Sequence, residues 1–236
     1  AAWRAGISAE VIWADVGSGI MVSKAINGIE TMTPNLFRSR KGSPGRAGLA
    51  LAKLHNSGET FDFRFDLFNM IDDYLKILSS KNSELPDGYH DIVEAAKPVK
   101  EALIAKPVTL APCHCDPLCE NFLDDGNYMW IVDWEYSGMN DPLWDLGDLS
   151  VEAGMDENQE NEMLIAYFGK EPTAPQRARV IIYKAMCDLL WTLWGLIQHA
   201  DKNPAEDFWA YSIERFERCK KLMKNSDFDA HLKAIK

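Results

Sequence analysis

The sequence predicts an α+β fold in which two short β-hairpins are embedded in a mostly helical chain. Two observations support this prediction. Short apolar runs flank polar turns near Gly17 and again near Gly126, and elsewhere apolar residues recur at intervals of three and four. With 236 residues, of which 47% are apolar and 26% charged, the chain can bury one sizeable core.

The first hairpin is predicted at residues 11–13 and 20–22, whose apolar runs are joined by a Gly17-Ser18-Gly19 turn. Residues 38–46 are rich in Lys, Arg, Gly, Ser and Pro, so we expect a mobile loop. Its basic side chains are expected to face solvent, with a phosphate site as the alternative. Helical spacing then predicts helices at 47–55, 65–78 and 84–106. Pro98 is expected to start or bend the last of these.

The second hairpin is predicted at residues 121–123 and 128–132, which an Asp-Asp-Gly-Asn turn separates, after a further strand at 108–110. Helices are predicted to follow at 160–168, 175–199 and 205–224. The most apolar of these helices contains Lys184 and Asp188, so we expect a buried helix rather than a membrane span.

Charge and cysteine usage narrow the classes of partner and compartment. The formal net charge of −11 argues against a nucleic-acid partner and suits a cationic substrate, or a metal carried with a nucleotide. The five cysteines are odd in number, and no apolar signal segment opens the chain. We therefore expect a cytoplasmic protein.

Three polar residues around the second hairpin carry the most specific pattern. Asp116 and Asn121 are five residues apart in the segment after His114, and Asp133 ends the returning strand. One carboxylate can orient a substrate hydroxyl and accept its proton, while an amide oxygen and a second carboxylate can hold the magnesium that bridges ATP phosphates. A purely structural role in turns is the alternative, because Asp and Asn are common there.

This order, His-x-Asp-x-x-x-x-Asn followed by a hairpin and Ile-Val-Asp-Trp-Glu, resembles the signature of choline/ethanolamine kinases and aminoglycoside phosphotransferases. The resemblance implies a protein-kinase-like fold, represented mainly by the helical C-terminal lobe with its catalytic-loop hairpin. It also implies that Asp116 is the catalytic base, that Asn121 and Asp133 bind Mg²⁺, and that ATP is the co-substrate.

Residues 135–147 are similar to the choline-kinase form of this family, in which a Glu-Tyr pair and then an Asp-Leu-Gly follow the metal-binding Asp. By this resemblance Asp145 is structural and braces the catalytic loop from a helix start. Glu152 stands where choline kinases place an acidic residue near the substrate's cation, and Tyr136 belongs to the substrate site. His114 is expected to brace the loop backbone rather than perform chemistry.

Trp191 and Trp194 are three residues apart and therefore share a helix face, where aromatic rings can hold a quaternary ammonium by cation–π attraction. The choline/ethanolamine kinases show a similar Trp-x-x-Trp followed by Gln and a later aromatic, which Tyr211 matches. The resemblance implies that these residues line the choline pocket. Packing in the core is the alternative, since the helix is apolar nearly all round.

A zinc site is a competing interpretation of the cluster Cys113-His114-Cys115 with Cys119, because thiolates and imidazoles bind zinc. The one-residue spacing is tight, and no second Cys or His pair nearby completes four ligands. Small buried residues beside a catalytic loop are the favoured interpretation.

The resemblance covers the latter part of the family's architecture. We find no glycine-rich phosphate loop, no strand Lys and no paired helix Glu, so residues 1–26 are expected to be the remnant of the N-terminal lobe and the hinge. Residues 27–236 would form the helical C-terminal catalytic lobe. The hinge backbone that meets the nucleotide is placed at Val22, Ser23, Lys24 and Ala25. A polypeptide that truly begins at Ala1 is expected to bind ATP weakly.

The leading hypothesis is an ATP-dependent phosphotransferase acting on the hydroxyl of choline or ethanolamine. An aminoglycoside or other small-molecule kinase of the same superfamily is the second, although such enzymes usually build acidic pockets rather than an aromatic box. A non-catalytic binding module is the third. No nucleic-acid partner and no membrane insertion are expected, and whether the chain forms a homodimer stays open.

Overall fold

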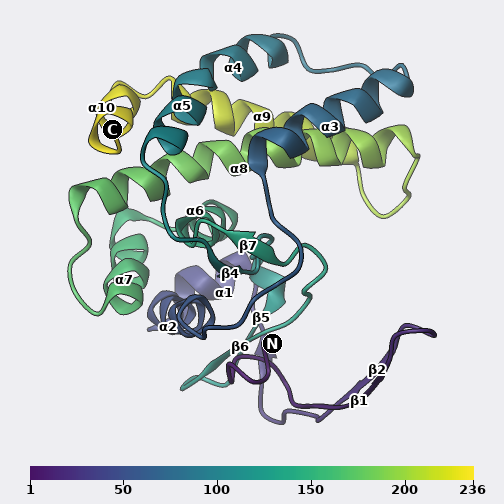
Figure 1. Cartoon of the computed structure of the whole chain (residues 1–236), viewed down its shortest axis with the longest axis vertical. Helices are drawn as coiled ribbons and strands as arrows, with labels where there is room; N and C mark the ends of the chain where they lie inside the picture. The colour runs from purple at the N-terminus through teal and green to yellow at the C-terminus, as the bar shows by residue number, and fades with distance from the viewer. The chain divides into compact units, whose positions relative to one another are not determined.

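The computed structural model describes residues 1–236 and confirms an α+β chain with two hairpins among helices (Figure 1). The chain forms two compact units, each built from two stretches of sequence. Unit 1 comprises Ala1–Arg64 and Thr109–Pro172, and unit 2 comprises Phe65–Val108 and Thr173–Lys236. The boundary predicted at residue 26, between a remnant of the N-terminal lobe and the C-terminal lobe, does not coincide with the limits of these units, and it stays a prediction.

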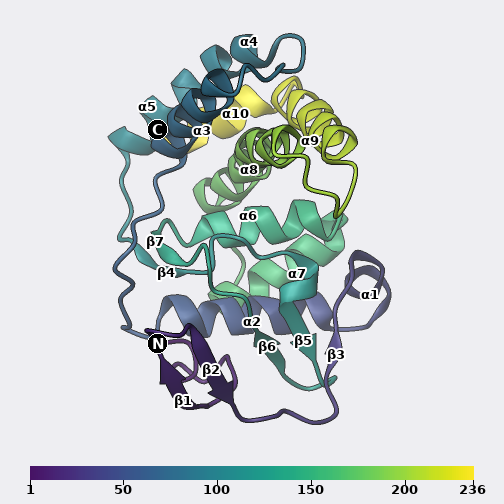
Figure 2. The same cartoon turned by 90° about the vertical axis from the view of Figure 1, so that its right-hand side faces the viewer.

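Unit 1 holds all the strands, which form three small antiparallel sheets (Figure 2). Strands β1 (Val11–Asp15) and β2 (Ile20–Ser23) form the first hairpin. Strand β5 (Phe122–Asp124) pairs with β3 (Glu30–Thr31) and with β6 (Met129–Ile131), and β4 (Ala111–Cys113) pairs with β7 (Gly138–Asn140). Both predicted hairpins are confirmed. The strand predicted at 108–110 lies instead at 111–113, where the side chains are buried.

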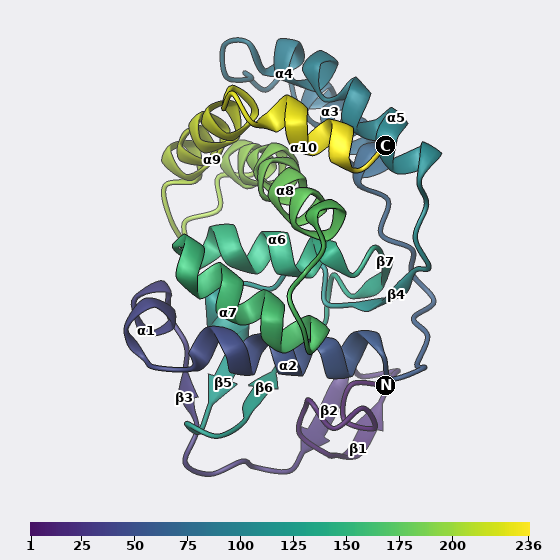
Figure 3. The ribbon, with the colours of Figure 1, turned by 90° about the vertical axis from the view of Figure 1, so that its left-hand side faces the viewer.

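The helices of unit 1 are α1 (Pro34–Ser39), α2 (Ser43–His55), α6 (Leu143–Glu152) and α7 (Glu157–Phe168). Helix α2 packs against α7 and also contacts β4, β6 and α6 (Figure 3). A Cβ atom at Gly48 of α2 would lie 2.3 Å from the backbone oxygen of Met163 in α7. Only glycine therefore allows the two helices to approach so closely.

The mobile loop predicted at residues 38–46 is wrong, because α1 ends at Ser39 and α2 begins at Ser43. Pro44 lies in the first turn of α2, where a missing N–H costs nothing. The basic residues here do not simply face solvent either. Arg46 makes two hydrogen bonds, of 2.8 and 2.6 Å, to the buried carboxylate of Asp124, and Arg40 makes a third of 3.1 Å.

The hydrogen bonds from Arg46 and Arg40 to Asp124 make the stability of the folded chain depend on pH. Burial by itself would raise the pKa of Asp124, but the hydrogen bonds from Arg46, the Gly126 amide and Arg40 hold that pKa below its usual range. The folded state therefore binds this proton less readily than the unfolded state. The stabilisation is present above the ordinary Asp pKa of about 4 and is lost as the pH falls through the lower folded value.

We expect Asp124→Asn to lower the free energy of unfolding at pH 7 by about 2 kcal/mol, the scale of a hydrogen bond to a charged group. The difference from the unsubstituted protein should shrink as the pH is lowered below about 4, because the carboxylate is then protonated. Urea denaturation across pH 3 to 7 measures it. The matched control is Asp125→Asn in the adjoining exposed turn, and an Asp124→Asn difference that does not depend on pH would contradict the assignment.

Unit 2 is helical and is organised around α8 (Ala174–Ala200), which packs against α9 (Phe208–Met223), α3 (Leu67–Ser80) and α10 (Phe228–Ala234). The single helix predicted at 84–106 is instead two helices, α4 (Tyr89–Ala95) and α5 (Lys97–Ala105). Pro98 stands in the first turn of α5 and so starts that helix. Helix α8 is long and apolar enough to cross a membrane, but 78% of its most apolar window is buried within the protein, as in a core helix.

One acidic residue of α8 is fully buried and paired. The Asp188 carboxylate accepts two hydrogen bonds from Arg218, of 2.7 and 2.6 Å, and Arg215 lies 3.4 Å away. The Arg215 guanidinium also stacks over the Tyr211 ring, 4.4 Å from its centroid. Asp188 thus anchors α9 to α8 through two charged contacts.

Candidate active site

The segment between β4 and β5 brings the predicted phosphotransfer residues to one place in unit 1. It ends in a short 3₁₀ helix, η1 (Cys119–Asn121). The Asn121 side-chain amide donates to the Asp116 carbonyl oxygen at 3.0 Å, and the Val132 amide donates to the Asn121 carbonyl oxygen at 3.0 Å. Asp133 directly follows Val132. The loop bearing Asp116 and Asn121 is therefore joined to the backbone that bears Asp133.

His114 fastens the same two segments together. One ring nitrogen, Nε2, lies 2.8 Å from the Val132 carbonyl oxygen, and the other, Nδ1, lies 3.3 Å from the Asp116 amide nitrogen. Burial lowers the pKa of His114, although nearby Asp145 acts in the opposite direction. A neutral ring satisfies both contacts if Nε2 donates and Nδ1 accepts. The structure thus places His114 against backbone groups on both sides of the site.

Two residues of the site have backbone conformations that are rare for residues other than glycine. Cys115 has φ of 70° and Asp133 has φ of 65°. Such conformations cost free energy and persist only where surrounding contacts hold them. At Cys115 the contacts come from α6: the Trp144 indole N–H donates to the Cys115 carbonyl oxygen at 3.0 Å, and Asp145 accepts the Cys115 amide at 2.9 Å.

Asp145 lies in the first turn of α6, and its side chain is fully buried. One carboxylate oxygen accepts the Cys115 amide, and the other accepts the His114 amide at 2.7 Å. A carboxylate suits two adjacent amides that point the same way, because it offers several acceptor sites. The loop that bears Asp116 is therefore held from α6 immediately before that residue.

The donor set at the mouth of this loop fits a magnesium ion. Asn121 binds the Asp116 carbonyl group through its side-chain nitrogen, so this contact does not use its Oδ1. Asp133 is exposed and supplies a carboxylate. Amide and carboxylate oxygens are the hard ligands that Mg²⁺ prefers, and Mg²⁺ usually keeps water and phosphate oxygens as further ligands.

The cysteines do not fit the competing zinc interpretation. All five are free and buried. Burial raises the pKa of Cys113, Cys115 and Cys119. The thiols of Cys113 and Cys115 contact the carbonyl oxygens of Asn140 and Gly138. Both ring nitrogens of His114 contact backbone groups as well.

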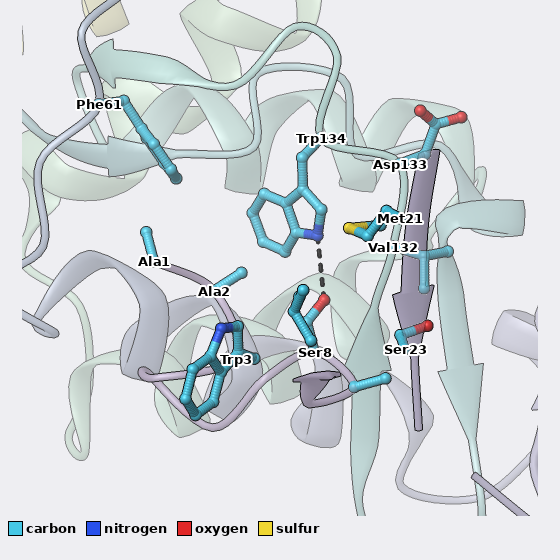
Figure 4. Close-up of a pocket in the computed structure, with 12 residues that line it drawn as sticks. Ala1, Ala2, Trp3, Ser8, Met21, Ser23, Phe61, Val132, Asp133 and Trp134 are labelled. Atoms are coloured by element: carbon cyan, nitrogen blue, oxygen red, sulfur yellow. Dashed lines mark hydrogen bonds between the residues drawn. The ribbon is translucent and has the colours of Figure 1, made fainter. Parts of the chain in front are cut away.

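A cavity of about 260 Å³ opens beside Asp133 and the first hairpin (Figure 4). Its walls include Met21, Ser23 and Val132, and the Trp134 indole points into it and donates to the Ser8 hydroxyl at 3.0 Å. The carboxylate of Asp133 points away from that indole in Figure 4. The other predicted hinge residues Val22, Lys24 and Ala25 are exposed on either side of Ser23.

The predicted aromatic site falls in unit 2. Trp194 contacts Tyr211 edge-to-face with ring centroids 5.8 Å apart, and both rings are half-buried. Trp191 is only 3% exposed. Phe208 completes the cluster, 5.6 Å from Trp194 and 6.2 Å from Tyr211, and sequence reasoning missed it. Its position three residues before Tyr211, on the same helix face, was the available signal.

The remaining predicted residues, Glu152 and Tyr136, lie in unit 1 and are half-buried. Glu152 is the last residue of α6. The next residue, Ala153, accepts a hydrogen bond of 3.0 Å from Arg38 of α1. The carboxylate of Glu152 thus stands at a helix end that α1 secures, opposite the end that carries Asp145.

The chain is similar to known phosphotransferases over most of its length. Residues 14–181 match the phosphotransferase enzyme family known as APH. A choline/ethanolamine kinase family protein from Mesorhizobium loti is 62% identical, with a TM-score of 0.95 over 99% of this chain and 80% of that one.

Two bacterial relatives are more distant. The choline kinase LicA of Streptococcus pneumoniae is 25% identical, with a TM-score of 0.77 over 92% of this chain and 75% of that one. Protein LicA of Haemophilus influenzae is 27% identical over 230 residues, which are 94% of this chain and 84% of that protein. These similarities confirm the predicted protein-kinase-like fold.

Proposed function

Because the chain belongs to the phosphotransferase enzyme family, and within it to the choline/ethanolamine kinases, we propose that it transfers the γ-phosphoryl group of ATP to the hydroxyl of choline, with ethanolamine as a close second substrate. The observation that carries this proposal is the joining of Asp116, Asn121 and the Val132–Asp133 backbone by hydrogen bonds.

Asp116 is proposed to orient the substrate hydroxyl and to accept its proton as the oxygen attacks the γ-phosphorus. The new phosphorus–oxygen bond forms as the bond to the ADP oxygen breaks, which gives phosphocholine and ADP. Asn121 and Asp133 would hold magnesium. When bound, that ion neutralises charge on the phosphates. His114 and Asp145 keep the loop in place through the backbone contacts described above.

The aromatic cluster of unit 2 supports a substrate with a quaternary ammonium group. The half-buried rings of Trp194 and Tyr211 contact each other and the buried Phe208, and accessible aromatic faces attract such cations. Trp191, which is buried, stays a predicted residue of the same pocket. Glu152 and Tyr136 stay predicted substrate-site residues.

The cavity of unit 1 supports binding of the nucleotide. It lies next to the predicted hinge at Ser23 and next to the proposed metal ligand Asp133. An apolar pocket with a carboxylate at its edge suits a flat base whose phosphates carry a metal ion. Localisation in the cytoplasm and self-association as a dimer stay predictions.

Steady-state kinetics with choline, ethanolamine and an aminoglycoside, each with Mg²⁺ and ATP, test the substrate. We expect turnover of choline, with ethanolamine close behind, and little with the aminoglycoside. Trp194→Ala should raise the KM for choline about tenfold, the scale of a well-formed cation–π contact, and should change the KM for ATP little.

The matched control is Trp130→Ala on β6 in unit 1. Turnover of the aminoglycoside without turnover of choline would overturn the substrate assignment. Calorimetric binding of choline, together with no turnover of any of the three alcohols, would favour the non-catalytic module.

A further inference from the structure

A largely buried network of hydrogen bonds connects three helices of unit 1 to the catalytic loop. The Tyr167 hydroxyl of α7 lies 2.9 Å from Nδ1 of His55 at the end of α2. Nε2 of the same ring lies 3.0 Å from the Asp145 carboxylate of α6. Asp145 in turn accepts the amides of His114 and Cys115, immediately before Asp116.

The hydrogen bonds of this network can all donate in one direction, from Tyr167 through His55 to Asp145. Burial raises the pKa of Tyr167 above its usual value, with a further contribution from nearby acidic groups, so the phenol keeps its proton. The Tyr167 hydroxyl can then donate to Nδ1 of His55, which leaves the ring proton on Nε2, facing Asp145. Tyr167 thus selects the tautomer in which His55 donates to the carboxylate.

A metal site is the alternative use of this cluster, since ligand atoms of His55, Cys113 and Asp145 lie within 4.8 Å of one another. The donor set argues against it. Both nitrogens of His55 already have partners, and Asp145 already accepts three hydrogen bonds. The Cys113 thiol, whose pKa is raised by burial, contacts the Asn140 carbonyl oxygen. The cluster is therefore a hydrogen-bond network.

The network helps to hold the backbone at Cys115 in a strained conformation. Cys115 has a positive φ, and the Asp145 carboxylate is one of the groups that hold it there. A carboxylate that is fixed on its far side by His55 has less freedom to turn away from the two amides. The position of Asp116, the next residue, depends on that restraint, and misplacing a reacting group slows chemistry more than it weakens binding.

We propose that Tyr167 and His55 are positioning residues of the phosphotransfer site, acting through Asp145 on the backbone that carries Asp116. The expected changes in kcat rest on the proposed function, whereas the hydrogen-bond network itself does not. The close approach of α2 and α7 at Gly48 brings Tyr167 within hydrogen-bonding distance of His55. The hydrogen-bond network therefore depends on the packing of these two helices.

The test uses the whole chain and measures kcat and KM for choline and ATP together with the melting temperature. Tyr167→Phe is expected to lower kcat about threefold to tenfold, the equivalent of one hydrogen bond, with both KM values within about twofold. His55→Leu leaves a buried carboxylate short of a donor and should lower kcat about 100-fold. His55→Gln, which can still donate to Asp145, should recover most of that loss. Tyr128→Phe, which removes a hydroxyl that contacts Gly6, is the matched control and should leave kcat unchanged.

The double variant Tyr167→Phe/His55→Leu should be no slower than His55→Leu alone, because Tyr167 acts only through His55. Equal kcat for Tyr167→Phe and the unsubstituted protein would overturn the proposal, and so would additive losses. A His55→Gln variant no faster than His55→Leu would also overturn it. If His55→Leu does not fold, the same comparison is made in the His55→Gln background, where the Tyr167→Phe loss should become smaller.

Hydrogen exchange of the peptide that contains residues 113–116 separates this inference from the proposed function, because it needs no substrate. The amides of His114 and Cys115 should exchange faster in Tyr167→Phe and in His55→Leu than in the Tyr128→Phe control, and His55→Gln should restore most of the protection that His55→Leu loses. Faster exchange without turnover of any tested alcohol by the unsubstituted protein would refute the proposed function and keep the network. Unchanged exchange would refute the network even if choline is a substrate.

Discussion

Replacing Asp116 by alanine is expected to lower kcat for choline phosphorylation by about 10² to 10⁴-fold, the range for removal of a general base. The melting temperature should change little, because Asp116 is only half-buried and the loop is held by its backbone and by Asp145. Stopped turnover with an unchanged melting temperature would separate the chemical role of Asp116 from a structural one.

The matched control is Asp72→Ala, which removes an exposed carboxylate from α3 and should leave kcat unchanged. Calorimetry should show that Asp116→Ala still binds MgATP, because Asn121 and Asp133 remain. An Asp116→Ala variant that retains kcat within about tenfold would remove Asp116 from its proposed role.

Asp188→Asn is expected to have the largest effect on stability, about 3 kcal/mol in the free energy of unfolding. The substitution preserves shape but removes the charge that faces Arg218 and Arg215, and Arg215 is only 6% exposed. A buried guanidinium without its carboxylate bears the full cost of its desolvation. Urea denaturation at pH 7 measures the loss.

Asp201→Asn is the matched control, since Asp201 forms an exposed ion pair with Lys81 and should contribute no more than about 1 kcal/mol. Arg215 also covers the Tyr211 ring, so Asp188→Asn should raise the KM for choline as well. Equal losses for the two variants would show that the Asp188 contacts do not anchor α9.

Sequence periodicity predicted most elements because it reports local geometry, and it failed where contacts distant in sequence decide the outcome. The segment 38–46 has a loop-like composition, yet Asp124, about 80 positions further along the chain, accepts hydrogen bonds from Arg40 and Arg46. The break between α4 and α5 was missed for a different reason: Pro98 permits either a kink or a new helix, and composition does not choose between them.

The spacing of Asp116, Asn121 and Asp133 predicts the kind of chemistry, because phosphoryl transfer needs a base and hard oxygen ligands, and a hairpin returns the third residue to the other two. Only the folded chain revealed what holds them. His55 shows no pattern with Asp145 or Tyr167, since it lies 90 positions before the first and 112 before the second. Local spacing encodes which side chains a loop presents, whereas the packing of whole helices decides which buried groups fix that loop.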